Sequence, residues 1–261
     1  DARALVHEAA LGVVLAEVVA AARSLAALAA ADAVANGRGA LRRRAGCRIK
    51  KACTRMDLPK TTIANKLHVC LEDTRLYRVH DERFDGNSFN PCMGDATRFT
   101  HLHAENGDCI PTSYAATTLD GAAFETVFRG IPDKYQAVPR QLLDDRMISI
   151  VQLQRSLQLV PLFTPELKAW NLNQAEVFAP HKDVYDFCRV LAFQCWRDNP
   201  TADGLIWSSV QDSGAHAMLL FGDRLQSEEL TVISSRCVRT DPTALDDLES
   251  AGGRGGWFIS K

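Results

Sequence analysis

Short apolar runs separated by polar loops fill the chain from about residue 74 onward. Some runs alternate apolar and polar positions and others are continuously apolar, so the pattern predicts short strands, both half-buried and fully buried. The run GLIWSSV at 204–210 is of the buried kind, and it stops on two adjacent serines, Ser208 and Ser209. The predicted strands are 75–80, 97–100, 113–117, 147–153, 157–162, 204–207, 216–221 and 230–238.

Two segments in this part of the chain follow helical spacing. The first covers about 119–129, with Thr118 or Asp120 as its N-cap. The second covers about 181–197, where apolar residues recur every three or four positions. Strands and helices do not alternate regularly, so the pattern predicts an α+β domain and not a doubly wound parallel sheet. The Gly-rich stretch 251–257 opens no helix, which argues against a dinucleotide fingerprint there.

The first part of the chain has a different composition. Residues 2–36 are rich in Ala, Leu and Val and contain no Pro, which predicts one or two amphipathic helices. Charged residues interrupt this run before it reaches the roughly 18 apolar residues of a membrane span, so we expect no membrane-spanning helix. Seven Lys or Arg residues then fall within 42–55. We therefore divide the chain into a helical segment with a basic linker, 1–70, and a second domain, 71–261.

Composition and charge narrow the class of protein. The chain of 261 residues is 46% hydrophobic and 24% charged, and its net charge of −2 gives no general attraction to nucleic acid or membrane. Its eight cysteines are scattered and form no CxxC pair, which argues against a zinc knuckle and favours reduced, mostly buried thiols. The cysteines and the lack of a usable N-glycosylation sequon favour a cytoplasmic protein.

Several standard catalytic motifs are absent from the sequence: P-loop, HExxH, GxSxG and Rossmann fingerprint. His101 and His103 would share one face of a strand, but two histidines without a third ligand do not predict a metal site, so we expect no metal. What remains is a dispersed set of polar residues within apolar elements, among them Arg78, Arg98 and Glu125. An ionised group in such surroundings is costly unless it is paired, so a structural Arg–Glu pair is one explanation.

The order of these polar residues resembles that of the RES domain family. The similar pieces are YRVH, RF, SYAAT followed about ten residues later by AAFE, and GLIWSSV followed by the apolar strand AMLLFGD. Known members of that family are largely bacterial toxins paired with antitoxins, are related in fold to ADP-ribosyltransferases, and act on NAD. The resemblance therefore implies a RES/ADP-ribosyltransferase-like mixed β-sheet with flanking helices, preceded by the helical N-terminal segment.

The resemblance also implies roles for individual residues. Arg78, Glu125 and Ser209 match the catalytic Arg, Glu and Ser that name the family, and Arg98 and Tyr114 match residues that bind NAD. These side chains suit the chemistry, because a guanidinium binds pyrophosphate in a fork geometry and a carboxylate stabilises an oxocarbenium-like transition state. A serine hydroxyl can hydrogen-bond to the ribose or the amide, and a tyrosine can stack on a ring.

The chain departs from the family pattern in three places. Thr97 replaces the usual Gly before Arg98, and Ser208 replaces a common Pro before Ser209. The first 70 or so residues have no counterpart in the minimal toxins of the family. The alignment still selects Ser209 as the family Ser, and Ser208 should point to the opposite side of the strand.

These features favour an enzyme that cleaves NAD at the nicotinamide–ribose bond, a glycohydrolase or phosphorylase that acts as a bacterial toxin. The enzymatic alternative is transfer of ADP-ribose to a protein target. The alternative of another class is a nucleic-acid or protein-binding module that uses the basic run 42–55. We expect NAD and a cognate antitoxin as partners, no membrane and no cofactor beyond NAD; nucleic acid is a less favoured partner, and a homo-oligomer stays open.

Overall fold

The computed structural model describes residues 66–129, 136–179 and 182–260. These residues form an eight-stranded mixed sheet in the order β1-β8-β9-β10-β5-β2-β7-β11. Strands β8 and β9 are parallel, and the other neighbouring pairs of this sheet are antiparallel. In sheet order the strands are β1 His68–Cys70, β8 Leu157–Pro161, β9 Gly204–Ser208, β10 His216–Phe221, β5 Thr112–Ala116, β2 Arg75–Asp81, β7 Arg146–Leu153 and β11 Leu230–Cys237.

Two short strand pairs and several helices complete the described domain. Strands β3 Leu102–His103 and β4 Cys109–Ile110 form an antiparallel pair, and β6 Ala137–Pro139 pairs in parallel with β12 Phe258–Ser260. The helices are α2 Leu119–Thr126, α3 Thr164–Ala169, α4 Gln174–Val177, α5 Tyr185–Asp198 and α6 Pro242–Gly255, with 3₁₀ turns η1 Arg140–Leu142, η2 Lys182–Val184 and η3 Ser227–Glu229. None of the described helices is long and apolar enough to cross a membrane.

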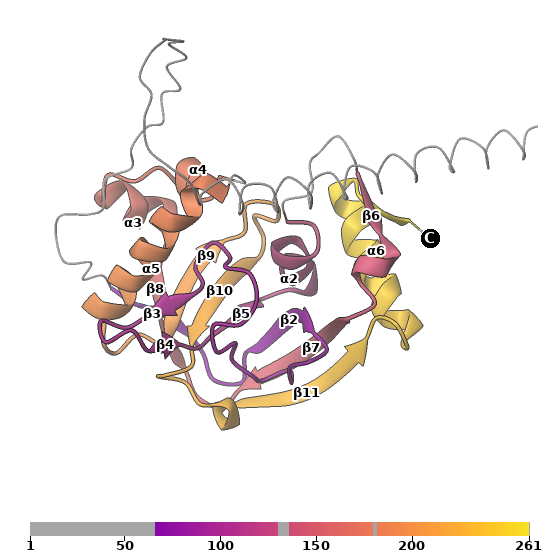
Figure 1. Ribbon diagram of the computed structural model, residues 1–261, viewed down its shortest axis with the longest axis horizontal. Helices are drawn as coiled ribbons and strands as arrows, with labels where there is room; N and C mark the ends of the chain where they lie inside the picture. Colours follow the sequence, from indigo (N-terminus) through magenta and orange to yellow (C-terminus); the bar gives the residue numbers. More distant parts are fainter. Residues whose placement is uncertain (1–65, 130–135, 180–181, 261) are drawn as a thin grey trace, which may run out of the picture. The chain divides into compact units, whose positions relative to one another are not determined.

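Helices cover one face of the curled sheet, where two apolar clusters form (Figure 1). The first cluster packs α5 against β8, β9 and β10, and includes Leu191 and Trp207. The second packs α2 and α6 against β2 and β7, and includes Phe128 and Leu248. A third cluster lies on the opposite face, and all eight strands of the large sheet contribute to it. Burial of both faces explains why β9 and β10 are continuously apolar in sequence.

Most predicted elements are confirmed. The domain is α+β, the seven predicted strands other than 97–100 match β2, β5, β7, β8, β9, β10 and β11 closely, and both predicted helices are present as α2 and α5. Thr118 caps α2 as expected, because its Oγ1 accepts a hydrogen bond from the Gly121 amide at 3.0 Å. The predicted strand 97–100 is wrong. Its backbone bends there, and the Thr97 amide and hydroxyl both hydrogen-bond to the Thr100 hydroxyl.

Helix α6 is an element that the sequence pattern did not indicate. The Asp241 side chain caps its start by accepting the Thr243 amide at 2.9 Å, and Pro242 occupies the first turn. The helix ends at Gly256, whose φ of +79° is the left-handed conformation that glycine adopts at little cost. Within the helix, Gly252 lets the Phe128 ring approach so closely that an added Cβ would lie 2.8 Å from the ring.

Strands β2 and β5 are neighbours in the sheet but pair over a very short length. They pair only at Tyr77 and Ala116 in the described sheet, whereas β2 pairs with β7 along all of its 7 residues. Beyond Tyr77 the two strands diverge, so the carbonyl groups of β5 there are not bound by β2 amides. Helix α2 follows β5 after only two residues and therefore lies next to this opening in the sheet.

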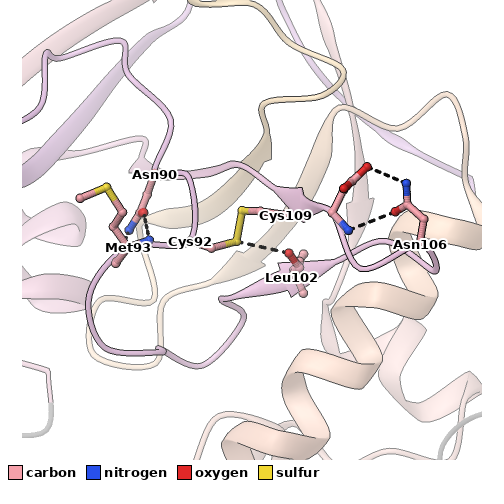
Figure 2. The surroundings of a disulfide bond; sticks show 7 residues. Asn90, Cys92, Met93, Leu102, Asn106 and Cys109 are labelled. Carbon is pink, nitrogen blue, oxygen red and sulfur yellow. Dashed lines mark hydrogen bonds between the residues drawn. A yellow bond between two sulfur atoms is a disulfide. The ribbon is translucent and has the colours of Figure 1, made fainter.

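A disulfide bond joins Cys92 and Cys109, whose Cα atoms are 6.1 Å apart (Figure 2). The expectation that the thiols are reduced is therefore wrong for this pair. Spacing along the chain could not reveal the bond, because the bend at 97–100 and the β3–β4 hairpin bring the two residues together. Among the described residues, Cys70, Cys188 and Cys195 are free and buried and Cys237 is free and half-buried, as expected of reduced thiols.

Several predictions fall at or beyond the limits of the described residues. The helical segment 2–36, the basic run 42–55, Cys47 and Cys53 lie outside them, so these remain predictions. Strand β1 precedes the predicted boundary at residue 71 and pairs with β8 at the edge of the sheet. A domain cut at residue 71 would lack this edge strand.

Candidate active site

A cavity of about 570 Å³ opens beside α2, within the range of roughly 300–1,000 Å³ that small-molecule sites occupy. Its walls come from α2 and the residues that follow it, from β2, β5, β6 and β7, from η1, from the bend at 96–97 and from the first residue of α5. The polar residues that line it are Thr97, Tyr114, Glu125, Thr126, Arg129, Arg146 and Tyr185. Two of the predicted site residues, Glu125 and Tyr114, therefore share one cavity.

Helix α2 places Glu125 at the cavity wall. The residues from Gly121 to Phe124 are buried. Gly121 allows the start of the helix to lie close to Ala215, since an added Cβ would be 2.6 Å from the Ala215 Cβ. Glu125 itself is half-buried in the last turn. Among the residues that the structure describes, its carboxylate forms no ion pair and no hydrogen bond. The structural Arg–Glu pair considered from the sequence is thus not formed here.

Tyr114 is held in the cavity wall through its hydroxyl group. The oxygen lies 2.9 Å from Thr97 Oγ1 and accepts a hydrogen bond from the Phe99 amide at 3.2 Å. Burial raises the pKa of the Tyr114 phenol, so the side chain is neutral at ordinary pH. Thr97, at the position where the RES pattern usually has Gly, thus fixes the orientation of this ring.

Arg78 spans the opening between β2 and β5. Its Nε donates to the Tyr114 carbonyl at 3.1 Å, and its Nη1 donates to the Gly86 carbonyl. Arg78 and Glu125 both line a small hollow that shares Tyr114 with the main cavity. Burial lowers the pKa of Arg78 to about 10, which leaves the guanidinium charged at neutral pH. The fold therefore brings Arg78, Tyr114 and Glu125 together.

A neutral histidine, His80, lies next to Arg78 and belongs to a hydrogen-bonded chain. His80 Nε2 lies 2.7 Å from Ser149 Oγ, which lies 2.6 Å from Ser235 Oγ. Burial and, secondly, the charge of Arg78 lower the pKa of His80 to about 4. A neutral imidazole avoids a second positive charge beside the buried guanidinium.

This histidine should make the protein less stable in mild acid. Between about pH 6.5 and pH 4 the unfolded chain takes up a proton on His80 and the folded chain does not, so the free energy of unfolding falls as the pH drops through this window. We expect His80→Gln to flatten this fall, as measured by urea unfolding at a series of pH values. The exposed His103 provides the control variant His103→Gln. Identical pH dependence in wild type and His80→Gln would contradict the assignment.

Arg98 lies outside the residues that line the cavity. Its Nη1 donates to the carbonyls of Val177 at 2.6 Å and Ala179 at 3.0 Å, and its Nη2 donates to the Phe178 carbonyl at 3.2 Å. The guanidinium thus binds the carbonyl groups at the end of α4. A direct contact between Arg98 and NAD stays a prediction, and the geometry gives this residue a role in fixing the end of α4.

Ser209 also lies outside the cavity lining. It directly follows β9 and is 3% exposed, and its Oγ has no hydrogen-bond partner among the described residues. Ser208, the last residue of β9, is half-buried. A buried hydroxyl group without a partner is uncommon in folded proteins, so Ser209 is the more unusual of the two serines.

The structure adds two cavity residues that the sequence did not single out, Arg129 and Tyr185. Arg129 follows Glu125 by four residues within the helix predicted over 119–129, and this spacing was a usable signal, although α2 itself ends at Thr126. Tyr185 comes from the start of α5, and nothing in the sequence connects it with α2. Within the described ranges, no three His, Cys, Asp or Glu side chains gather closely enough to hold a metal ion.

Comparison with known proteins agrees with this fold. The RES domain matches residues 75–241, which include Arg78, Tyr114, Glu125 and Ser209. The chain belongs to the RES domain family. No curated protein matches it at the level of sequence.

A solved structure supports the same RES fold. A chain in the crystal structure of the M. tuberculosis MbcT–MbcA toxin–antitoxin complex is 14% identical, with a TM-score of 0.51. The similarity covers 70% of this chain and 92% of that chain. The RES fold of MbcT is therefore present here, whereas α6 and β12 lie beyond residue 241 and outside the RES match.

Proposed function

We propose that the protein cleaves NAD at the bond between nicotinamide and ribose. The observation that carries this proposal is the carboxylate of Glu125, half-buried in a cavity and without an ion pair in the described part of the chain. Cleavage of this bond builds positive charge on the ribose, and the electron pair of the bond leaves with nicotinamide. A negative charge fixed beside the ribose stabilises that transition state.

The other residues of the site suit a dinucleotide substrate. Tyr114 offers an aromatic ring next to Glu125, on which a planar base or nicotinamide can stack. Arg78 keeps its positive charge and lines the adjoining hollow. In this proposal the ADP-ribose passes to water or to phosphate, and the enzymatic alternative passes it to a protein side chain.

Membership of the RES family and the fold shared with MbcT support a role as the toxin of a toxin–antitoxin pair. In this role the protein depletes NAD inside a bacterial cell until a cognate antitoxin binds it. The alternative of a module that binds nucleic acid through the basic run 42–55 concerns residues outside those described, and no described feature favours it.

The deciding experiment incubates the full chain with NAD and separates the products by chromatography. Release of nicotinamide together with ADP-ribose indicates hydrolysis, and release with a phosphorylated ADP-ribose, dependent on added phosphate, indicates phosphorolysis. A labelled ADP-ribose group that stays on protein indicates transfer to a protein. If no nicotinamide is released, whether water, phosphate or a protein is the available acceptor, the proposal is contradicted.

The paired serines provide a sharper test of the site. We expect Ser209→Ala to lower kcat/KM for NAD about 2- to 10-fold, the equivalent of about 0.5–1.5 kcal/mol for one neutral hydrogen bond. The reason is that the buried Ser209 hydroxyl group, which has no partner in the described residues, gains one from the substrate. Ser208→Ala is the matched control and should be nearly neutral. A damaging Ser208→Ala together with a silent Ser209→Ala would reverse the assignment.

A further inference from the structure

Arg129 is a cation of the cavity whose donors are not all used. It follows α2 and lines the cavity, and its Nη2 is buried without a hydrogen-bond partner among the described residues. A buried guanidinium nitrogen without an acceptor is costly. A ligand that brings an acceptor to this point would remove that cost.

The neighbouring carboxylate does not satisfy Arg129. Glu125 lies in the last turn of α2, whereas Arg129 lies beyond the end of the helix at Thr126. The structure forms no ion pair between them within the described residues. Both side chains therefore remain available to a ligand that has a positive centre and a negative group.

The guanidinium groups of Arg129 and Arg98 both lie over the ring of Tyr185. The guanidinium carbon of Arg129 lies 5.6 Å from the Tyr185 ring centroid, and that of Arg98 lies 5.5 Å from it. The two cations differ in what they bind, because Arg98 donates to three backbone carbonyls. Of these two guanidinium groups, Arg129 is the one with an unused donor at the cavity.

Arg129 is positively charged at neutral pH. Burial acts to lower the pKa of its guanidinium, but the nearby Tyr114, Tyr185 and Glu125 raise it above the ordinary value overall. The other cation that lines the cavity, Arg146, lies 3.3 Å from the Asp145 carboxylate and is partly neutralised by it. Positive charge in the cavity is therefore concentrated at Arg129.

We propose that Arg129 is the phosphate-binding residue of this cavity, with Tyr185 as the surface that holds its guanidinium in place. A planar guanidinium binds two oxygens of a phosphate group at once, and Tyr185 fixes the plane of the fork. That the ligand is a nucleotide rests on the proposed NAD cleavage. The phosphate belongs either to the pyrophosphate of the dinucleotide or to free inorganic phosphate that accepts the ADP-ribose.

The test measures binding by calorimetry and needs no turnover. The full chain is titrated with ADP-ribose and, separately, with inorganic phosphate, in wild type, Arg129→Gln and Arg129→Lys. The control is Arg239→Gln, because Arg239 is exposed and pairs with Glu82 away from the cavity. Thermal unfolding of each variant confirms that it is folded.

We expect Arg129→Gln to weaken the binding of at least one of the two probes about 10- to 150-fold, with Arg239→Gln unchanged. Arg129→Lys keeps the charge but loses the fork, so its affinity should lie between those of wild type and Arg129→Gln. It also provides the measurement if Arg129→Gln does not fold. A loss confined to ADP-ribose identifies the pyrophosphate of the substrate, and a loss that includes inorganic phosphate identifies a site that also takes free phosphate.

Two results overturn the proposal: no binding of either probe to the wild type, or affinities of the folded Arg129 variants within 2-fold of wild type. Both are separate from failure of the proposed function. A protein that releases no nicotinamide but binds ADP-ribose through Arg129 would lose the proposed function and keep the phosphate site. A protein that releases nicotinamide, but whose folded Arg129 variants bind both probes as the wild type does, would keep the function and lose this site.

Discussion

Glu125→Gln should reduce the rate of nicotinamide release from NAD at least about 100-fold. The substitution keeps the size and shape of the side chain but removes the negative charge, and loss of one preorganised electrostatic group typically costs 10²- to 10³-fold in rate. The carboxylate forms no ion pair in the described residues, so its removal leaves no partner unpaired and the free energy of unfolding should change little. The measurement is the initial rate at saturating NAD, with urea unfolding in parallel.

Glu249→Gln is the matched control for this variant. Glu249 is exposed on α6, so the same chemical change there should leave the rate within 2-fold of wild type. A folded Glu125→Gln that retains the wild-type rate would remove Glu125 from the mechanism and with it the main support for NAD cleavage.

Loss of the Cys92–Cys109 bond should lower the free energy of unfolding by about 2–4 kcal/mol. The bond closes a loop across a sequence separation of 17 residues, and a crosslink of that length restricts the unfolded chain by about 3 kcal/mol. The loop carries Thr97 and Arg98, which fix Tyr114 and the end of α4 at the cavity. We therefore expect the Cys92→Ser, Cys109→Ser double variant to be less stable and to bind NAD more weakly.

Reductant provides an independent check of the disulfide. Excess thiol should lower the unfolding midpoint of the wild type towards that of the double variant, and the double variant itself should not respond. Cys237→Ser is the control, because Cys237 is free and half-buried and its loss should leave the response to reductant unchanged. An unfolding midpoint of the wild type that does not change with reductant would contradict the predicted contribution.

The sheet was predictable because its strands carry a strong apolar signal. Runs such as 204–207 and 216–221 are apolar almost throughout and are buried on both faces. Helix α6 was not predictable in the same way. Gly252, Gly253 and Gly255 weaken its helical propensity. The rings of Phe128 and Phe124, which pack closely against Gly252 and Gly255, come from a distant part of the sequence.

The site was predictable only in part, and mostly through resemblance to the family. Arg78, Tyr114 and Glu125 were selected by their order in the chain, and the structure places them around adjoining cavities. The periodic pattern could not show that Arg98 binds the carbonyls at the end of α4, because that contact joins segments 79 to 81 residues apart. Tyr185 was missed for the same reason, because its contact with Arg129 joins the start of α5 to a residue far away in the sequence.

The C-terminal part of the chain shows that a family boundary is not a folding boundary. The RES match ends at residue 241, yet α6 begins at the next residue and lies beside α2 (Figure 1). The ring of Trp257 stacks on Phe128 at 5.3 Å, and Arg254 forms an ion pair with Asp120. A fragment that ends at the limit of the family match would expose the rings of Phe124 and Phe128, which lie in and just after the helix that carries Glu125. Expression of this protein, and any grafting of its RES domain onto another chain, should therefore retain every residue through at least the last strand.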